Sequence, residues 1–358
     1  MNSLLATSIG GFALPNPIIC GSGEPVLTES GIRAALAAGA AGVIAKSVNE
    51  RPEAAAQLDR ADYARADANG RAVAWNAPGS SLFCRSGLQQ RAVEDWFAAI
   101  ARIDREAAAE QKFVAASLVL GSHEGAVQIA TAAQRAGLRV FELNIGAPHA
   151  SEAKPGAIVL ETEPARVQAL VAAVRVATEG MQLWVKLTGL STNLPALAVA
   201  AKQGGADAVV MMGRFMGMIP DIDTFAPVLG TSGAYSGPWA LPIVCRFLAL
   251  SRRAVGSDFP LLGTNGVRDG ADVARMALAG ASAVEALSVV MLEGFSALTR
   301  IRDELEAVLA ERKVTFAELI GRTADCLEGY GEQPVNPGRW QDFVPVATRR
   351  GPATYGKS

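Results

Sequence analysis

One pattern recurs eight times along this chain and constrains its fold more than any other feature: a short apolar run followed by a longer stretch with helical spacing. Short runs with little alternation are typical of parallel strands buried on both faces. Eight strand–helix units predict a (β/α)8 TIM barrel, an α/β fold. The 358 residues accommodate the usual barrel length of about 250 residues plus insertions. The eight runs cover residues 17–20, 41–45, 113–120, 139–143, 183–187, 208–212, 260–263 and 283–287.

The remaining segments extend this predicted barrel. Residues 4–14, which are β-prone on both sides of a Gly-Gly pair, predict an N-terminal hairpin. Insertions at 48–90 and 213–238 each follow a strand, so they lie on the C-terminal face, where barrels keep their active sites. We expect a barrel domain over residues 1–312, and a C-terminal helix and tail over 313–358 that pack on the barrel.

Composition excludes several classes of partner. A formal net charge of −2 favours neither nucleic acid nor an anionic membrane surface. The four cysteines form no Cys-x-x-Cys pair, so neither a disulfide framework nor an iron–sulfur or zinc site is expected. The sequence shows no leader pattern and no apolar run of about 18 residues. We therefore expect a reduced, cytoplasmic protein without membrane spans that acts on a small molecule.

Polar side chains follow several of the predicted strands. The run before Asn144 ends on that residue and then breaks into a loop that contains His149, as a strand does when it delivers side chains to a barrel active site. Lys46 and Lys186 end two other strands, where an ammonium group can stabilise negative charge on a bound ligand. Each lysine could instead form an ordinary ion pair at the rim. The presence of both favours the ligand-binding interpretation.

Glycine-rich loops follow the late strands. Ser232-Gly233 follows the sixth strand, Asn265-Gly266 the seventh and Ser288 the eighth. Barrels commonly bind phosphate with backbone N–H groups of the loops after strands seven and eight, and glycine permits the close approach. A single glycine could be only a turn residue, but together these loops predict a phosphate site.

The motifs, taken in order, resemble the family of dihydroorotate and dihydropyrimidine dehydrogenases over roughly residues 15–290. They are Asn16-Pro17, Gly21-Ser22-Gly23, Ala45-Lys46-Ser47, Arg85-Ser86-Gly87-Leu88, Glu142-Leu143-Asn144, Val185-Lys186-Leu187, Gly233-Ala234-Tyr235 and Gly263-Thr264-Asn265-Gly266. The resemblance implies the cofactor FMN. It implies FMN contacts from Gly21, Ser22, Lys46, Ser47, Asn144 and Lys186, and phosphate contacts from Ser232, Gly233, Asn265, Gly266 and Ser288.

The chain departs from that family where substrate is bound. Dihydroorotate dehydrogenases carry a Cys or Ser base where this chain has Ala147, and dihydropyrimidine dehydrogenases carry a Cys where it offers Leu160 and Glu161. A pocket that loses its amide groups no longer recognises the same ring. We expect FMN to be retained and the substrate to differ from dihydroorotate. The family prefers Gly at the position of Leu287, and its substrate-binding asparagines correspond here to Cys84, Gln90 and Met211.

Few groups remain that could transfer the proton. His149 is the best candidate, since the dihydropyrimidine enzymes also have His in this loop, although it could instead hold backbone or a substrate carbonyl. His123 follows the third strand and either caps the next helix or shapes the substrate pocket. Cys84 could act as an acid or nucleophile, but lone cysteines in apolar surroundings are usually inert. Lys46 is included among the catalytic candidates because of its place at the ring.

Three hypotheses follow. The first is an FMN-dependent oxidoreductase that acts on a CH–CH or C=C bond of a small cyclic or conjugated carbonyl compound by hydride transfer at flavin N5. The second is an oxygen-activating flavin enzyme, which tolerates a missing base. The third is a catalytically degenerate flavin-binding barrel. The chain shows no Gly-x-Gly-x-x-Gly fingerprint after its first strand, so a separate electron donor or acceptor is expected. The resemblance is compatible with a homodimer.

Overall fold

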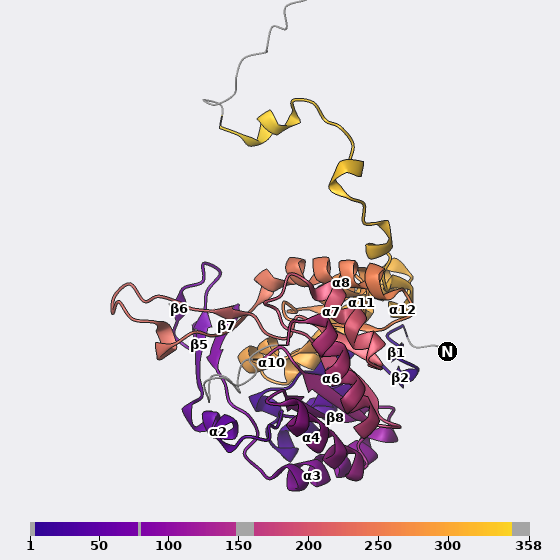
Figure 1. The fold of residues 1–358 in the computed structure, drawn as a ribbon. Coiled ribbons are helices and arrows are strands. Elements are labelled where there is room, and N and C mark those ends of the chain that lie inside the picture. The colour runs from indigo at the N-terminus through magenta and orange to yellow at the C-terminus, as the bar shows by residue number, and fades with distance from the viewer. Residues whose placement is uncertain (1–3, 78–79, 148–160, 346–358) are drawn as a thin grey trace, which may run out of the picture. The chain divides into compact units, whose positions relative to one another are not determined.

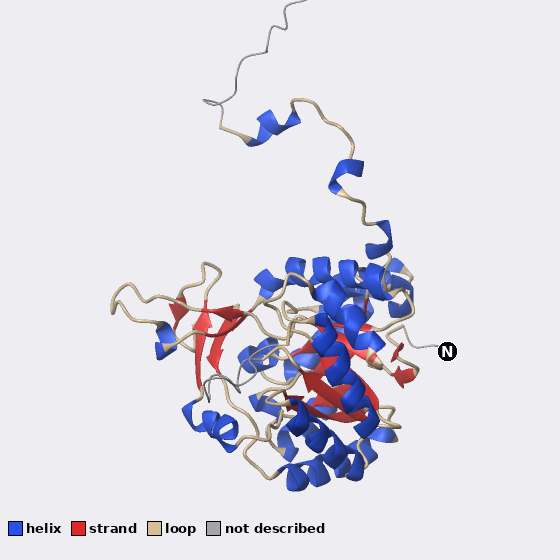
Figure 2. Ribbon diagram, in the orientation of Figure 1, coloured by secondary structure: helices blue, strands red, loops and turns tan. Residues whose placement is uncertain are grey.

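The computed structural model describes residues 4–77, 80–147 and 161–345. Its central feature is a closed barrel of eight strands, in which β15 pairs with β3 to complete the circle. Figures 1 and 2 show barrel strands with helices packed around them. Every neighbouring pair in the barrel is parallel, which confirms the predicted TIM barrel. The barrel strands are β3 (Ile18–Cys20), β4 (Gly42–Ile44), β8 (Phe113–Val119), β9 (Val140–Asn144), β10 (Gln182–Lys186), β11 (Ala208–Met211), β14 (Leu261–Thr264) and β15 (Ala281–Ala286).

Helices surround the barrel and bury their apolar faces against it (Figure 2). Several begin at the side chains that favour helix starts: Thr28, Ser122 and Asp269 each accept a backbone N–H of the first turn. The helices are α1 (Glu29–Ala37), α3 (Val93–Ala108), α4 (His123–Arg135), α6 (Pro164–Ala177), α7 (Leu194–Gln203), α8 (Leu241–Val255), α9 (Gly270–Leu278), α10 (Ser288–Glu293), α11 (Ser296–Arg312) and α12 (Phe316–Leu319). Short 3-10 turns are η1 (Glu24–Val26), η4 (Pro238–Ala240) and η5 (Ala324–Cys326).

The predicted N-terminal hairpin is present and packs at the barrel's N-terminal end. β1 (Thr7–Ile9) pairs antiparallel with β2 (Phe12–Leu14). Both strands contribute to a core cluster that fills the lower barrel interior. Within it the Phe12 ring meets Phe113 edge-to-face at 5.7 Å, and Phe113 meets Trp184 at 5.2 Å. The hairpin thus closes the end of the barrel opposite its ligand-binding face.

Residues that point into the barrel change from apolar to polar toward the C-terminal ends of the strands. Alternate residues of a strand share a face, so β9 presents Val140, then Glu142, then Asn144 to the interior, and β15 presents Ala283, then Glu285. The lower layers belong to the apolar core, whereas the upper layer carries charges and amides. The barrel itself therefore prepares a polar floor at one end.

The two insertions combine into a second sheet on the C-terminal side, which we call the roof sheet. The first insertion supplies β5 (Asp62–Ala66), β6 (Ala72–Val73) and β7 (Ser81–Arg85), and the second supplies β12 (Met216–Gly217) and β13 (Gly233–Ser236). All pairings are antiparallel, and β7 joins β13 across the two insertions (Figure 1). The insertions also hold the short turns α2 (Pro52–Ala55), η2 (Ala56–Arg60) and η3 (Val228–Gly230). This sheet was not predicted.

The chain divides into two compact units, residues Met1–Asp325 and Cys326–Ser358. In the first, α12 ends before Gly321, whose φ of +82° is unfavourable for continuing a helix. The described part of the second unit contains η6 (Tyr330–Glu332) and η7 (Arg339–Phe343). Across the ranges that the structure describes, no helix is long and apolar enough to cross a membrane.

Candidate active site

A cavity lies between the C-terminal mouth of the barrel and the roof sheet. It encloses about 1020 Å³, including its open mouth. Its lining comes from the ends of the barrel strands and from β7 and β13. Nine of the eleven residues predicted to contact FMN line it: Gly21, Ser22, Lys46, Ser47, Asn144, Lys186, Asn265, Gly266 and Ser288.

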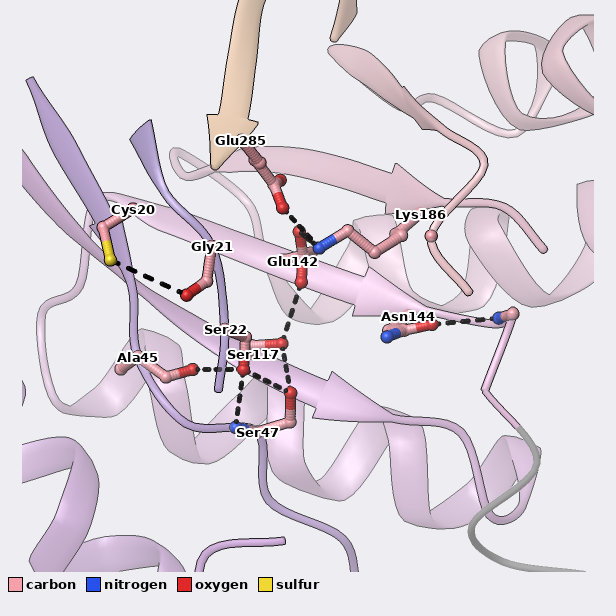
Figure 3. A network of polar contacts seen from close by, with 12 residues as sticks. Cys20, Gly21, Ser22, Ala45, Ser47, Ser117, Glu142, Asn144, Lys186 and Glu285 are labelled. Atoms are coloured by element: carbon pink, nitrogen blue, oxygen red, sulfur yellow. Dashed lines mark hydrogen bonds and ion pairs between the residues drawn. The ribbon is translucent and has the colours of Figure 1, made fainter. Parts of the chain in front are cut away.

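The floor of the cavity holds three buried charged side chains. Lys186, at the end of β10, places its Nζ 2.8 Å from Glu142 Oε2 and 2.5 Å from Glu285 Oε2 (Figure 3). All three side chains are at most 8% exposed. A single ammonium group thus forms ion pairs with two carboxylates, one from β9 and one from β15. We call these three residues the floor trio.

Burial and mutual repulsion shape the ionisation of the floor trio. Desolvation, together with the neighbouring Glu142 carboxylate, raises the pKa of Glu285 to about 8 despite the opposing Lys186 charge. Burial alone would lower the pKa of Lys186, but the two carboxylates outweigh it and raise that pKa. The two carboxyl groups thus share a single ammonium group in a layer with little access to water.

A chain of serine hydroxyls leads from the floor trio to the first strands of the barrel. Ser117 Oγ donates to Glu142 Oε1 at 3.0 Å, and Ser22 Oγ donates to the Ala45 carbonyl at 3.0 Å. Ser47 Oγ lies between them, 2.8 Å from the Ser117 hydroxyl and 3.0 Å from that of Ser22 (Figure 3). The hydroxyl protons of Ser117 and Ser22 are both donated to other groups, which restricts the rotamers of these side chains.

A second charged group lies beneath the roof sheet. Lys46 Nζ donates to Glu24 Oε1 at 3.0 Å, and Tyr63 of β5 also hydrogen-bonds the Glu24 carboxylate. Burial pushes the pKa of Glu24 upward, but Lys46 and Tyr63 together bring that pKa below its usual value. Burial raises the pKa of the nearby Cys84 thiol, so Cys84 is a neutral thiol at neutral pH and a poor nucleophile.

The loop after β14 is shaped by unusual backbone angles. Asn265 has a φ of +70° and donates its amide to the backbone carbonyls of Met212 and Gly213. Gly266 has a φ of +90°, and a Cβ there would lie 2.6 Å from the Leu241 backbone nitrogen. Only glycine fits that close approach, which keeps the loop backbone at the cavity surface.

Leu287, where the resemblance favours glycine, is accommodated by a glycine elsewhere. A Cβ on Gly23 would lie 2.6 Å from both Leu287 methyl groups. Gly23 therefore provides the space that the larger side chain occupies. Both residues line the cavity, so the Leu287 side chain forms part of its surface.

The other predicted site residues lie elsewhere. Ser232 and Gly233 line an outer hollow beside the cavity, and β13 brings Ser236 to the cavity instead. Gln90 is exposed and donates to Asp59, whereas Met211 is fully buried in the core. His123 Nε2 lies 3.6 Å from Glu161 Oε2 and is not part of the cavity lining. His149 lies outside the described residues.

Arg214 is a lining residue that sequence reasoning missed. Its guanidinium donates to Ser86 Oγ at 2.9 Å, and it lines both the cavity and the outer hollow. No carboxylate within 4–77, 80–147 or 161–345 forms an ion pair with it. In the sequence, Arg214 comes soon after the strand that ends at Met211, and this position could have indicated that it lies at the mouth of the barrel.

The fold and the cavity define a class of protein: a (β/α)8 barrel with a polar, glycine-containing ligand site at its C-terminal mouth. The family model described as dihydroorotate dehydrogenase matches residues 4–309. The chain therefore belongs to the dihydroorotate dehydrogenase family.

Individual relatives agree with this assignment. The chain is 29% identical over 313 residues to the catalytic subunit of dihydroorotate dehydrogenase B (NAD(+)) of Pyrococcus furiosus, covering 87% of this chain and 96% of that protein. It is 36% identical over 154 residues to dihydroorotate dehydrogenase A (fumarate) of Limosilactobacillus reuteri, covering 43% of this chain and 48% of that protein. For the B-type catalytic subunit of Methanocella arvoryzae, the match is 33% over 186 residues, 52% of this chain and 60% of the relative. The chain thus spans about half the length of the last two relatives.

The floor trio makes a stability prediction. Lys186→Met leaves two buried carboxylates without their ammonium, so we expect a loss of about 3–5 kcal/mol in the free energy of unfolding. The folded variant should bind more protons than its unfolded chain, so its free energy of unfolding should fall as pH rises. The loss relative to wild type should therefore be larger in alkaline than in mildly acidic buffer. Urea unfolding at both pH values measures this. Lys313→Met, at an exposed helix end, is the control, and an equal effect of both variants would contradict the prediction.

Proposed function

We propose that this protein is an FMN-dependent oxidoreductase that acts on a CH–CH or C=C bond of a small cyclic or conjugated carbonyl compound other than dihydroorotate. The observation that carries the proposal is the gathering of nine predicted cofactor residues around one cavity. Family membership supports an oxidoreductase. We further propose that a separate donor or acceptor exchanges electrons with the protein.

The residues present fit FMN. A Cβ on Gly266 would lie 2.6 Å from the Leu241 backbone nitrogen, so only glycine lets this loop backbone lie at the cavity surface. Lys186, Lys46 and Asn144 would hold the ring, and the loop at Gly266 together with Ser288 would hold the phosphate. When bound, the flavin supplies hydride transfer at N5.

The protein's own groups would orient substrate beneath the roof sheet. Lys46 is fixed by Glu24, and the neutral Cys84 thiol offers only a weak hydrogen bond. Arg214 is available to pair with an anionic substituent of the substrate, and its contact with Ser86 orients the guanidinium. The roof sheet itself helps exclude water from the reacting bond. The amide groups that bind a pyrimidine in the family are replaced here, which supports a different substrate.

Cofactor content is the first test. Purified or reconstituted protein should show a flavin absorbance spectrum, and mass spectrometry of the released cofactor should identify one FMN per chain. Gly266→Ala should bind FMN at least about tenfold more weakly, which equals about 1.4 kcal/mol, because the added Cβ displaces the loop backbone. Gly331→Ala, where a Cβ meets nothing within 4 Å, is the control. Wild-type protein that stays colourless after reconstitution would sink the proposed function.

The proton donor is tested at His149. We propose that His149 supplies the proton on the substrate side, so His149→Ala should lower turnover about 10²–10⁴-fold while FMN stays bound. Anaerobic reduction of unsaturated cyclic carbonyl compounds, followed by flavin absorbance, measures the rate. His123→Ala is the matched control, because His123 lies outside the cavity lining. Unchanged turnover in His149→Ala removes that residue from the mechanism.

Substitution of Arg214 tests whether the substrate carries a negative charge. If Arg214 pairs with an anionic substituent, Arg214→Gln should raise KM for such a substrate roughly ten- to a hundredfold, which equals about 1.4–2.7 kcal/mol, with little change for a neutral analogue. Steady-state kinetics with a carboxylated enone and its methyl ester provide the comparison. Arg105→Gln, on the exposed side of α3, serves as control. Equal effects on both substrates would contradict a pairing role.

A further inference from the structure

The floor trio has an unequal number of positive and negative groups. With every group ionised, Lys186 contributes +1 and Glu142 and Glu285 contribute −1 each, which leaves −1 in a buried layer. A net buried charge without a counterion is costly, and binding one proton removes it. The two carboxyl groups are also close enough to hydrogen-bond each other when one is protonated.

Among the residues that the structure describes, Lys186 is the positive charge that acts on Glu285. Facing Glu285 are Glu142 from β9, Lys186 from β10 and the Cys20 thiol from β3. Burial and Glu285 together raise the pKa of Cys20 to about 12, so this thiol is neutral. Thr264, the partner of Glu285 on β14, is uncharged. Within the described chain, Glu285 Oε1 is buried and has no hydrogen-bond partner, although Glu285 belongs to the cavity lining.

We propose that Glu142 and Glu285 share one proton beside Lys186, so that the floor trio is a pH-sensitive charge facing the ring site. With the proton bound, the trio is neutral; without it, the trio carries −1. Once the proton leaves, the negative charge of the floor trio repels an anionic ring above it, so such a ring binds more weakly.

This inference gives Glu285 a role distinct from that of Lys186. Lys186 supplies a constant positive charge. Protonation of Glu285 changes the net charge of the floor trio, and therefore the electrostatic potential in the cavity. Glu285 is therefore a positioning and tuning residue and not a proton donor to substrate, since it lies in the floor and not beneath the roof sheet. Its effect on the cofactor rests on the proposed function, whereas the shared proton does not.

The shared proton is tested by infrared spectroscopy of the protein with and without FMN. Wild type should show the carbonyl stretch of a buried protonated carboxyl at neutral pH, and this band should disappear in alkaline buffer. Glu285→Gln should lack it. Glu142→Gln should also lack it, because the remaining carboxylate then pairs with Lys186 alone. Glu161→Gln, a buried carboxylate paired with Arg166, is the control and should keep the band.

The outcomes separate clearly. A wild-type protein without the band, or a band that survives in Glu285→Gln, overturns the proposal. If Glu285→Gln fails to fold, Glu142→Gln carries the same test. Loss of FMN binding with the band intact would count against the proposed function only.

A second readout addresses the cofactor. In FMN-loaded protein, the reduction potential of the flavin should fall more steeply with pH in wild type than in Glu285→Gln, because only wild type loses the proton over that range. Parallel slopes for the two proteins would show that the trio does not act on the ring site, and would overturn the charge-switch part of the proposal.

Discussion

The ion pairs of Lys186 with Glu142 and Glu285 are the interaction on which the rest of the site depends. They join β9, β10 and β15, three strands of the barrel, at the layer where its interior changes from apolar core to ligand site. Buried charges tolerate little rearrangement, because each shift exposes a group to an uncompensated environment. The trio therefore fixes the floor, and the serine chain from Ser117 to Ser22 extends that order to the opposite wall.

Above this floor the site is built differently. Lys46, Glu24 and Tyr63 link the barrel to the roof sheet, so the upper wall depends on an insertion and not on the barrel alone. The lower part gathers residues that the family resemblance assigns to FMN, while the upper part carries Cys84 and Arg214. Our proposal that flavin chemistry is retained while the substrate differs rests on this division.

The sequence was sufficient to predict the barrel because eight buried parallel strands leave eight apolar runs. The glycine at position 266 likewise marks a close backbone approach. The sequence was less informative about Glu142 and Glu285. Each sits within an otherwise apolar strand, where only the two-residue alternation shows that it faces inward. Nothing in the sequence indicates that Glu24 pairs with Lys46, since the two residues lie 22 positions apart. The roof sheet was missed since its strands are short and come from two distant insertions.

The pairing of β7 with β13 makes these two insertions a single structural element. Changes that accumulate in one insertion alter the edge against which the other must pair, so the two segments are constrained to vary together. Transplanting only residues 48–90 or only 213–238 onto a related barrel would leave half of an antiparallel ladder without its partner. New substrate preferences in this architecture are therefore best obtained by exchanging both segments at once, while the charged floor of the barrel is left unchanged.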